Sequence, residues 1–172
     1  MKKINLLLIV SIISTKIFSQ NNEVKFNMAS AIAGFPELTY ERLIDDNISF
    51  GMSFASSIEK PEKMRSRYCF TPFSRLYFGK KKSDGFFVEA NMILKGQRDV
   101  HDENIYDTLN NVSSVNKIDK STTNFGFGAT VGVKLLAKKY AFAELFAGGG
   151  RLFGSPINDA YFRGGLTIGF RF

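Results

Sequence analysis

The chain has 172 residues, enough for one domain, and a formal net charge of +7. Lys2, Lys3 and Lys16 lie in a predicted export signal, so the mature chain carries 7 − 3 = +4, and this modest excess together with export excludes nucleic acid as a partner. The single cysteine, Cys69, excludes an intramolecular disulfide framework, and we interpret it as a small strand residue.

Residues 1–19 have the pattern of a cleavable secretory signal peptide. Lys2 and Lys3 give a basic start, residues 6–13 form an apolar run, and Ser19 places a small residue before an expected cut at Gln20. The run is too short for a mature transmembrane helix, which needs about 20 apolar residues. We therefore expect export through the Sec pathway and one mature domain, residues 20–172.

Alternating apolar and polar residues predict strands along the mature chain, because a period of two places neighbours on opposite faces. Proline and short polar runs such as Asp45-Asp46-Asn47 interrupt the alternation and predict turns. The predicted strands are residues 24–34, 37–44, 48–58, 67–79, 86–96, 122–136, 140–150 and 160–172.

The last predicted strand shows the alternation most clearly. Large apolar groups share one face up to the end of the chain, whereas the other face carries arginine, threonine and glycine. The apolar face consists of Phe162, Leu166, Ile168, Phe170 and Phe172, with Gly164 among them. An outer-membrane barrel ends in this way, because its last strand closes the sheet and faces lipid.

Eight strands are the smallest even number found in such barrels. The connections after the second, fourth and sixth predicted strands are short, and those after the third, fifth and seventh are longer. The longest, residues 97–121, is polar and aperiodic, and we expect an irregular surface loop there. Short turns in the periplasm and long outer loops would place both termini in the periplasm.

The mature chain resembles the small outer-membrane β-barrel proteins of Gram-negative bacteria, with the architecture of the OmpA transmembrane domain and OmpX. The resemblance is carried by residues 36–42, 71–78, 85–90 and the last strand. It implies an all-β, eight-stranded, antiparallel, up-and-down transmembrane barrel. Phe170 and Phe172 resemble the C-terminal signal that the barrel-assembly machinery reads. The implied partners are that machinery, outer-membrane lipids and lipopolysaccharide, and an unidentified envelope or surface protein.

Four charged residues are predicted to meet inside the barrel as an ion cluster. Glu41, Arg75, Glu89 and Glu144 all lie opposite the apolar faces, about four or five residues from a predicted periplasmic turn, and so at similar height for a rise of about 3.3 Å per residue. If Phe78 pairs with Phe86, antiparallel counting places Arg75 opposite Glu89.

Other functions stay open from the residues alone. His101, Asp102, Glu103 and Asp107 are permissible cation ligands, but their spacing does not repeat, and a solvated loop is the simpler interpretation. An enzyme acting on lipid would need a base on a rigid element, whereas the only histidine lies in the predicted loop.

A small pore and a secreted, lipocalin-like barrel are the remaining alternatives. Gly126, Gly128 and Gly132 create space inside the barrel, although large side chains are expected to fill it; these are Phe73, Tyr77, Phe142 and Phe146. A lipocalin would place the apolar faces inward, and alternation alone does not decide which face is inside. We therefore predict a structural or interaction role, such as envelope integrity, adhesion or an accessory subunit, with no catalytic residue, cofactor or metal site.

Overall fold

The computed structural model describes residues 21–58, 66–107, 112–137, 140–154 and 160–172. The predicted signal peptide lies outside these ranges. Within them the chain forms eight antiparallel strands and one short helix, and the prediction of eight strands is confirmed. The elements are β1 (Asn22–Asn27), α2 (Met28–Ile32), β2 (Glu37–Leu43), β3 (Ile48–Ser56), β4 (Ser66–Tyr77), β5 (Gly85–Asp107), β6 (Val112–Leu136), β7 (Ala141–Phe153) and β8 (Ala160–Arg171).

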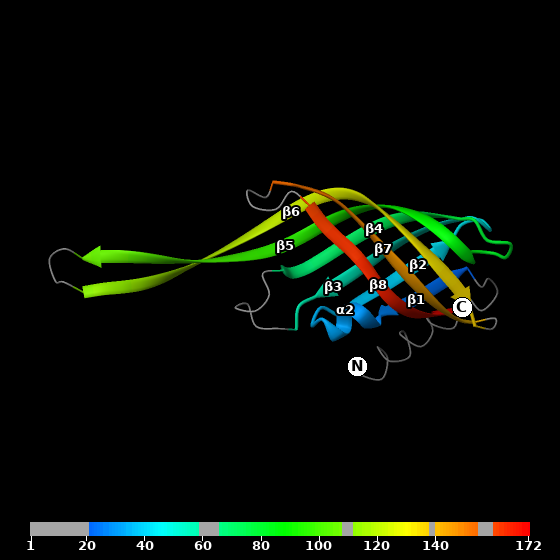
Figure 1. Cartoon of the computed structure of the whole chain (residues 1–172), viewed down its shortest axis with the longest axis horizontal. Helices are drawn as coiled ribbons and strands as arrows, with labels where there is room; N and C mark the ends of the chain where they lie inside the picture. The colour runs from blue at the N-terminus through cyan, green and yellow to red at the C-terminus, as the bar shows by residue number, and fades with distance from the viewer. Residues whose placement is uncertain (1–20, 59–65, 108–111, 138–139, 155–159) are drawn as a thin grey trace, which may run out of the picture.

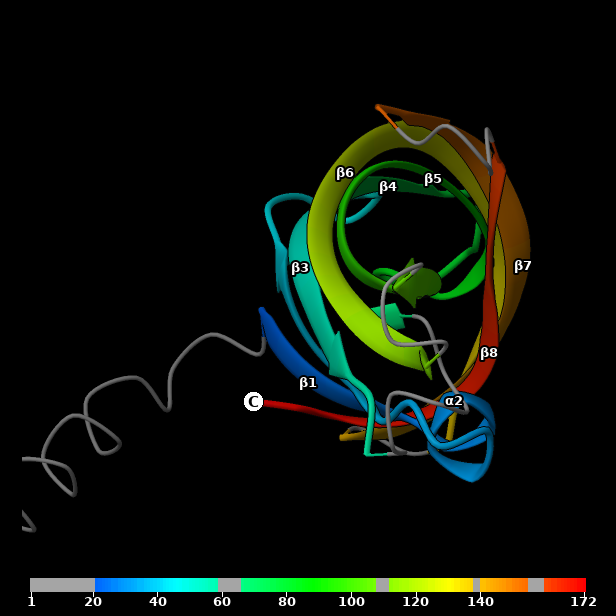
Figure 2. The same ribbon diagram turned by 90° about the vertical axis from the view of Figure 1, so that its left-hand side faces the viewer.

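Each strand pairs with its neighbours in sequence, and β1 pairs with β8, which closes the barrel (Figures 1 and 2). One end carries the short β2–β3, β4–β5 and β6–β7 connections together with the C-terminus, and we call it the turn end. From the opposite end β5 and β6 project well beyond the other strands, and we call it the ribbon end (Figure 1). No helix in the described ranges is long and apolar enough to cross a membrane.

The first predicted strand, residues 24–34, is wrong beyond Asn27. The chain turns there into α2, because the Asn27 side chain accepts a hydrogen bond from the Ser30 backbone amide at 3.2 Å and caps the helix. Alanine-rich residues 28–33 favour helix, and Gly34, at φ 80°, ends the segment. The outward methionine and isoleucine that extended the apparent alternation belong to this helix.

The predicted irregular loop, residues 97–121, is also wrong. β5 continues to Asp107 and β6 begins at Val112, and the two pair without a break from Arg98↔Ser121 to Asp107↔Val112. Beyond the barrel this ribbon pairs with none of the other described strands. Its sequence is polar and lacks the apolar alternation on which the strand prediction relied, and the sequence pattern therefore missed it.

The apolar faces of all eight strands point outward and the polar faces inward. Outward residues include Phe50, Phe54, Val131 and Leu145, whereas Glu41, Arg75 and Glu89 are fully buried; the alternation along β2, buried and exposed in turn, is typical. Outward aromatic rings gather near both ends. Phe125, Phe127 and Phe153 pack together towards the ribbon end, and Tyr140 stacks on Phe170 at the turn end.

Large side chains fill the interior. Tyr77, Phe87 and Phe146 form a buried cluster, and Phe73 and Phe142 are buried as well. The space beside the small inward residues is occupied. A Cβ on Gly128 would lie 2.4 Å from the Tyr161 hydroxyl, and one on Gly132 would lie 2.5 Å from the Phe87 ring. The glycines therefore admit aromatic groups rather than leave an open channel.

Candidate functional site: the buried ion network

Ten charged side chains are buried inside the barrel in the described ranges, and their charges balance. Five are acidic and five basic, so the interior carries no net charge when all are ionised. They come from seven of the eight strands: Glu23, Lys25, Glu37, Glu41, Arg75, Glu89, Lys134, Glu144, Arg163 and Arg171. Balance matters here, because an unpaired buried charge is costly.

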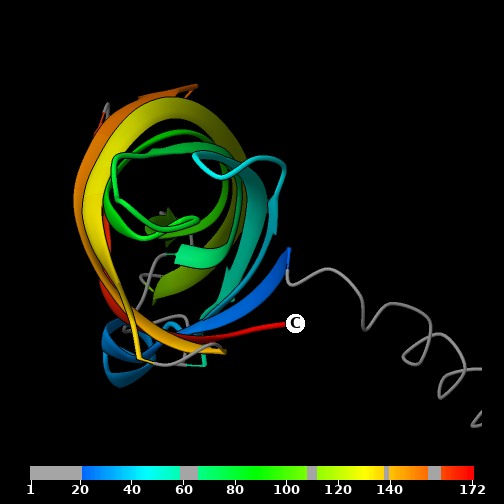
Figure 3. The ribbon, with the colours of Figure 1, turned by 90° about the vertical axis from the view of Figure 1, so that its right-hand side faces the viewer.

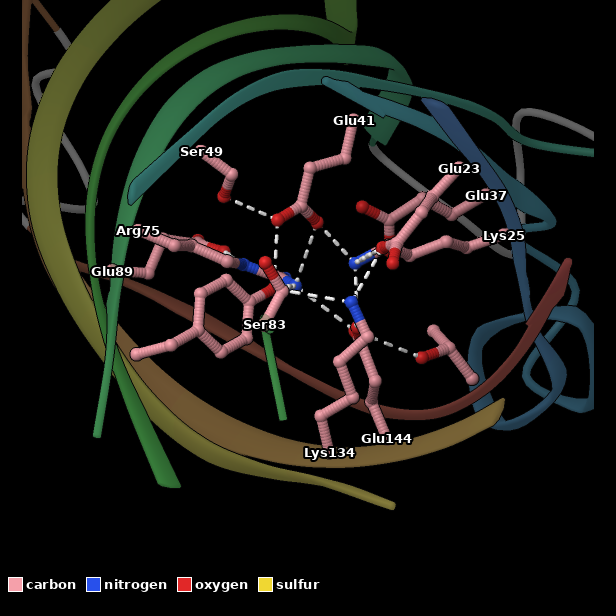
Figure 4. Close-up of polar contacts among 12 residues, drawn as sticks. Glu23, Lys25, Glu37, Glu41, Ser49, Arg75, Ser83, Glu89, Lys134 and Glu144 are labelled. Carbon is pink, nitrogen blue, oxygen red and sulfur yellow. Dashed lines mark hydrogen bonds and ion pairs between the residues drawn. The ribbon is translucent and has the colours of Figure 1, made fainter. Parts of the chain in front are cut away.

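Arg75 on β4 lies at the centre of the network (Figure 4). It stands directly opposite Glu89 in the β4–β5 register, and its Nε donates to Glu89 Oε2 at 2.8 Å. Its Nη1 donates to Glu41 at 3.1 Å and to Glu144 at 3.0 Å, across the barrel. The planar guanidinium thus satisfies three carboxylates from three strands, for which its fork of donors is suited.

Two lysines complete the central group. Lys25 on β1 donates to Glu41 and Glu144 and lies 3.5 Å from Glu23, and Lys134 on β6 donates to Glu23 and lies 3.4 Å from Glu144. The carboxylate oxygens of Glu23, Glu41 and Glu144 lie within 4.8 Å of one another, a spacing that would also suit a cation. The Lys25 ammonium contacts all three acids and supplies the positive charge there.

Hydroxyl groups and aromatic rings surround these charges. Tyr77 donates to Glu41 at 2.7 Å, and Ser49 donates to the same carboxylate. The Arg75 guanidinium lies 4.3 Å from the Phe87 ring centre and 4.6 Å from that of Phe73, as in cation–π contacts. The network is therefore both hydrogen-bonded and tightly enclosed.

Arginines extend the network towards both ends of the barrel. Arg163 on β8 joins Glu89, at 3.0 Å, to Glu37, at 2.6 Å, on the side of the ribbon end. Arg171 donates to Glu23 at 2.8 Å and also to the backbone carbonyls of Lys82 and Ser83. The buried Ser83 shows that the β4–β5 turn folds across the turn end (Figure 3). The charges thereby lie behind a closed turn.

The structure brings all four residues of the predicted cluster together. Sequence reasoning missed the other members, although the same alternation places them inward; these are Glu23, Lys25, Glu37, Lys134, Arg163 and Arg171. Lys25 and Glu23 were missed because no turn connects β1 to β8, so nothing in the sequence sets the register across the closing seam. This arrangement of mutually neutralised charges offers stability, but no free base beside a nucleophile.

The other residues singled out from the sequence lie apart from this network. Phe170 and Phe172 point outward, 55% and 47% exposed, and the backbone of Phe172 exchanges hydrogen bonds with Asn22 at 2.8 and 3.0 Å. Cys69 is half-buried on β4, with its sulfur 3.4 Å from the Thr71 hydroxyl. The strand β5 carries the remaining group, His101, Asp102, Glu103 and Asp107, whose side chains lie outside the described part of the chain. The interpretation that these side chains are solvated and hold no metal therefore stays a prediction.

Comparison with known proteins gives the fold. No family model and no curated protein matches the chain. Among solved structures it is similar to the N-terminal β-barrel domain of OprF from Pseudomonas aeruginosa, with a TM-score of 0.51 and 15% sequence identity, over 88% of this chain and 96% of that one. The chain shares the fold of that barrel. The architecture implied by the sequence resemblance is thereby confirmed. At 15% sequence identity the similarity shows the fold alone.

Proposed function

We propose that the protein is an integral outer-membrane β-barrel with a structural or interaction role and no catalytic activity. One observation carries this proposal: the charged side chains are turned into the barrel, and its outer wall is an apolar belt with aromatic rings near both rims. In hydrocarbon every backbone polar group needs a partner, which a closed barrel provides, and aromatic girdles are typical of both membrane interfaces.

The proposed topology places the turn end in the periplasm and the ribbon end at the cell surface. Short turns and both termini of the mature chain would then be periplasmic, after export through the Sec pathway and removal of residues 1–19. Membrane lipids and lipopolysaccharide would surround the wall, and the assembly machinery would recognise β8 through Phe170 and Phe172 during biogenesis.

The ribbon favours an interaction role over a purely structural one. Residues 98–107 and 112–121 pair only with each other among the described strands, so both outer backbone edges are unpaired. Unpaired strand edges are templates for a further strand from another protein. A surface or envelope protein is the partner that this feature would fit.

The alternatives fit the interior less well. A lipocalin-like barrel would hold its apolar groups inside, whereas here ten charges occupy the interior. A pore would need a path past Arg75, Tyr77 and Phe146, which are buried in contact with one another or with shared partners. A lipid-modifying enzyme would need a nucleophile beside a free base, and the buried carboxylates near Ser49 are already engaged with lysine and arginine.

An epitope tag tests both location and topology. A tag inserted near Asn110, in the connection between β5 and β6 and outside the described residues, should be reached by antibody on intact cells. The tagged protein should still be found in the outer-membrane fraction as a barrel with heat-modifiable gel mobility. A matched tag between Lys138 and Lys139 should be reached only after the outer membrane is broken. Reaching the second tag, and not the first, on intact cells would reverse the topology. Recovery of the protein as a soluble species would overturn the membrane assignment.

A further inference from the structure

The barrel wall is incompletely paired on the ribbon-end side of its closing seam. β1 pairs with β8 only from Glu23↔Arg171 to Asn27↔Thr167, because the chain then turns into α2. β8 itself continues to Ala160 and pairs with β7 as far as Arg151. Residues 160–166 thus have no strand partner on the β1 side in the described ranges. Asn27 donates from its side chain to the Gly164 carbonyl at 3.4 Å, and α2 lies beside this edge (Figure 2).

A cavity opens at this incomplete stretch of the wall. Its main part measures about 540 Å³, within the range of small-molecule sites, and an adjoining part measures about 160 Å³. The two parts share lining residues from α2 and its loop, β4, β5 and β8. The shared residues are Ser30, Phe35, Cys69, Ile93, Phe162 and Gly164.

The lining leads from the outer wall into the barrel. Phe162 is 78% exposed on the outward face of β8, whereas Ile93 is buried inside. Two small groups, Ala29 on α2 and Ala33 at its C-cap, form the near wall of the main cavity. A chain lying in the surrounding hydrocarbon could therefore enter the main part sideways between α2 and β8. The main part is lined by apolar groups such as Ala29, Ile93 and Phe162, whereas the adjoining part is also lined by Glu37 and Arg163, which pair with each other.

One cation lies in the same cavity. Lys95 on β5 lines the main part, is half-buried, and has no carboxylate within ion-pair distance among the described residues. In lacking such a carboxylate, Lys95 differs from the five buried bases of the ion network, each of which contacts at least one acid. A half-buried ammonium with no acid in reach among the residues that the structure describes favours an anionic group on a bound molecule.

We propose that this cavity binds one acyl chain of an anionic amphiphile, which enters laterally between α2 and β8. The tail lies against Ala29, Ala33 and Ile93, and the anionic head lies near Lys95. A free fatty acid and a single-chain anionic phospholipid share this chemistry. The inference rests on the membrane orientation proposed above, since the tail must come from the bilayer.

Cys69 provides a direct test, because it lines both parts of the cavity and is the only cysteine of the chain. The barrel is placed in phosphatidylcholine nanodiscs, and its insertion is checked by heat-modifiable gel mobility, so that failure to insert is separated from failure to bind. The rate of maleimide labelling is then measured with and without palmitate. At palmitate about ten times above its Kd, labelling should slow about tenfold, because only the unoccupied fraction reacts.

Matched variants locate the effect. Ala29→Phe fills the cavity from α2 and should abolish protection by palmitate, whereas Ile32→Phe, at a position 86% exposed on the same helix and outside the lining, should leave it unchanged. Lys95→Met should weaken palmitate binding about tenfold, with each variant normalised to its own rate without palmitate, as expected for loss of a charge-assisted contact. Ala33→Phe provides a second filled variant if Ala29→Phe does not fold.

Other amphiphiles distinguish the source and the head group. Protection by palmitate alone indicates a free fatty acid, and stronger protection by palmitoyl lysophosphatidylglycerol indicates a phospholipid. Hexadecanol, which has the same tail without the charge, should protect about tenfold less well than palmitate. Equal protection by hexadecanol would overturn the role of Lys95. The site would be overturned if none of the three amphiphiles protected Cys69 from labelling. It would also be overturned if Ala29→Phe and Ile32→Phe lost protection by palmitate to the same extent.

Discussion

The two halves of this barrel differ in how completely they are closed. In the turn-end half all eight strands pair around the ring, and Arg75, Lys25 and Lys134 join the carboxylates across it. In the ribbon-end half β1 is replaced by α2, the edge of β8 is left to the helix, and a cavity reaches the interior. The closed half is built to be stable, and the half with the cavity leaves room for a ligand.

The two halves differ in the number of charges that meet inside them. Inside the closed half every carboxylate has a basic partner, and removal of one partner leaves the others buried and unbalanced. Near the cavity fewer charges meet. Arg163 joins Glu37 to Glu89, and beside this pair of contacts lie the Tyr161 to Asn91 hydrogen bond and the apolar cluster of Ile93, Leu152 and Tyr161. We therefore expect substitutions in the turn-end half to cost more stability than substitutions in the ribbon-end half.

The largest effect is expected at the closing strand. Phe170 pairs with Val24 and stacks on Tyr140, and Phe172 is joined to Asn22 through the backbone. The double change Phe170→Ala and Phe172→Ala should remove most of the folded barrel from the outer membrane. Heat-modifiable gel mobility measures this, and Phe162→Ala, on the same outward face at the ribbon end, is the control. Normal amounts of folded double variant would show that these rings are dispensable for assembly.

Arg75→Met should destabilise the barrel by about 3–5 kcal/mol, because three buried carboxylates lose a common partner. The free energy of unfolding is measured by urea titration in nanodiscs or detergent. Ser74→Met, the neighbouring outward position on β4, controls for the longer apolar side chain. A loss no larger than that of the control would mean that the charges are separately solvated.

A smaller effect is expected where side chains crowd the ribbon-end half. Gly128→Ala would bring a Cβ within 2.5 Å of the Gly149 carbonyl as well as close to Tyr161, and such overpacking costs about 1–3 kcal/mol. Ala129→Val, at the next residue of β6, adds methyl groups to the outer face and should leave the free energy of unfolding almost unchanged. Urea unfolding of the two variants compares them directly, and equal stability would show that β6 and β8 can move apart there.

The smallest effect should follow removal of the ribbon. Replacing residues 99–120 with a two-residue Asn-Gly turn keeps the Arg98↔Ser121 pair and should change the free energy of unfolding by no more than about 0.5 kcal/mol. The barrel should still show heat-modifiable mobility. Loss of folding would mean that the ribbon supports the barrel and is more than an interaction arm.

Much of the barrel could be predicted from the sequence, because a wall with one apolar and one polar face imposes a period of two. The β4–β5 turn sets the register from Phe78 and Phe86, whose backbones are hydrogen-bonded at 2.8 Å, and Arg75 stands opposite Glu89 as counted. No turn sets the register of β1 with β8, so the places of Glu23 and Lys25 in the network could not be counted in the same way.

Two regions escaped prediction for opposite reasons. α2 continues the apparent alternation of β1, and the helix is decided by the Asn27 cap, a local contact that competes with strand pairing. The ribbon pairs as two strands although its sequence lacks apolar alternation, so a period of two could not reveal it. The cavity follows from the first of these, since a β1 that ran to Gly34 would have covered the edge of β8.

A double-mutant cycle shows whether the interior charges of the turn-end half act as one network. Unfolding free energies are measured for Arg75→Met, Glu89→Gln and the double variant, with Arg75→Met and Ala129→Val as a control pair that shares no contact. The double variant should be less destabilised than the sum of the two single variants by at least about 1 kcal/mol, and the control pair should be additive. Additivity of Arg75 and Glu89 within about 0.5 kcal/mol would contradict the network.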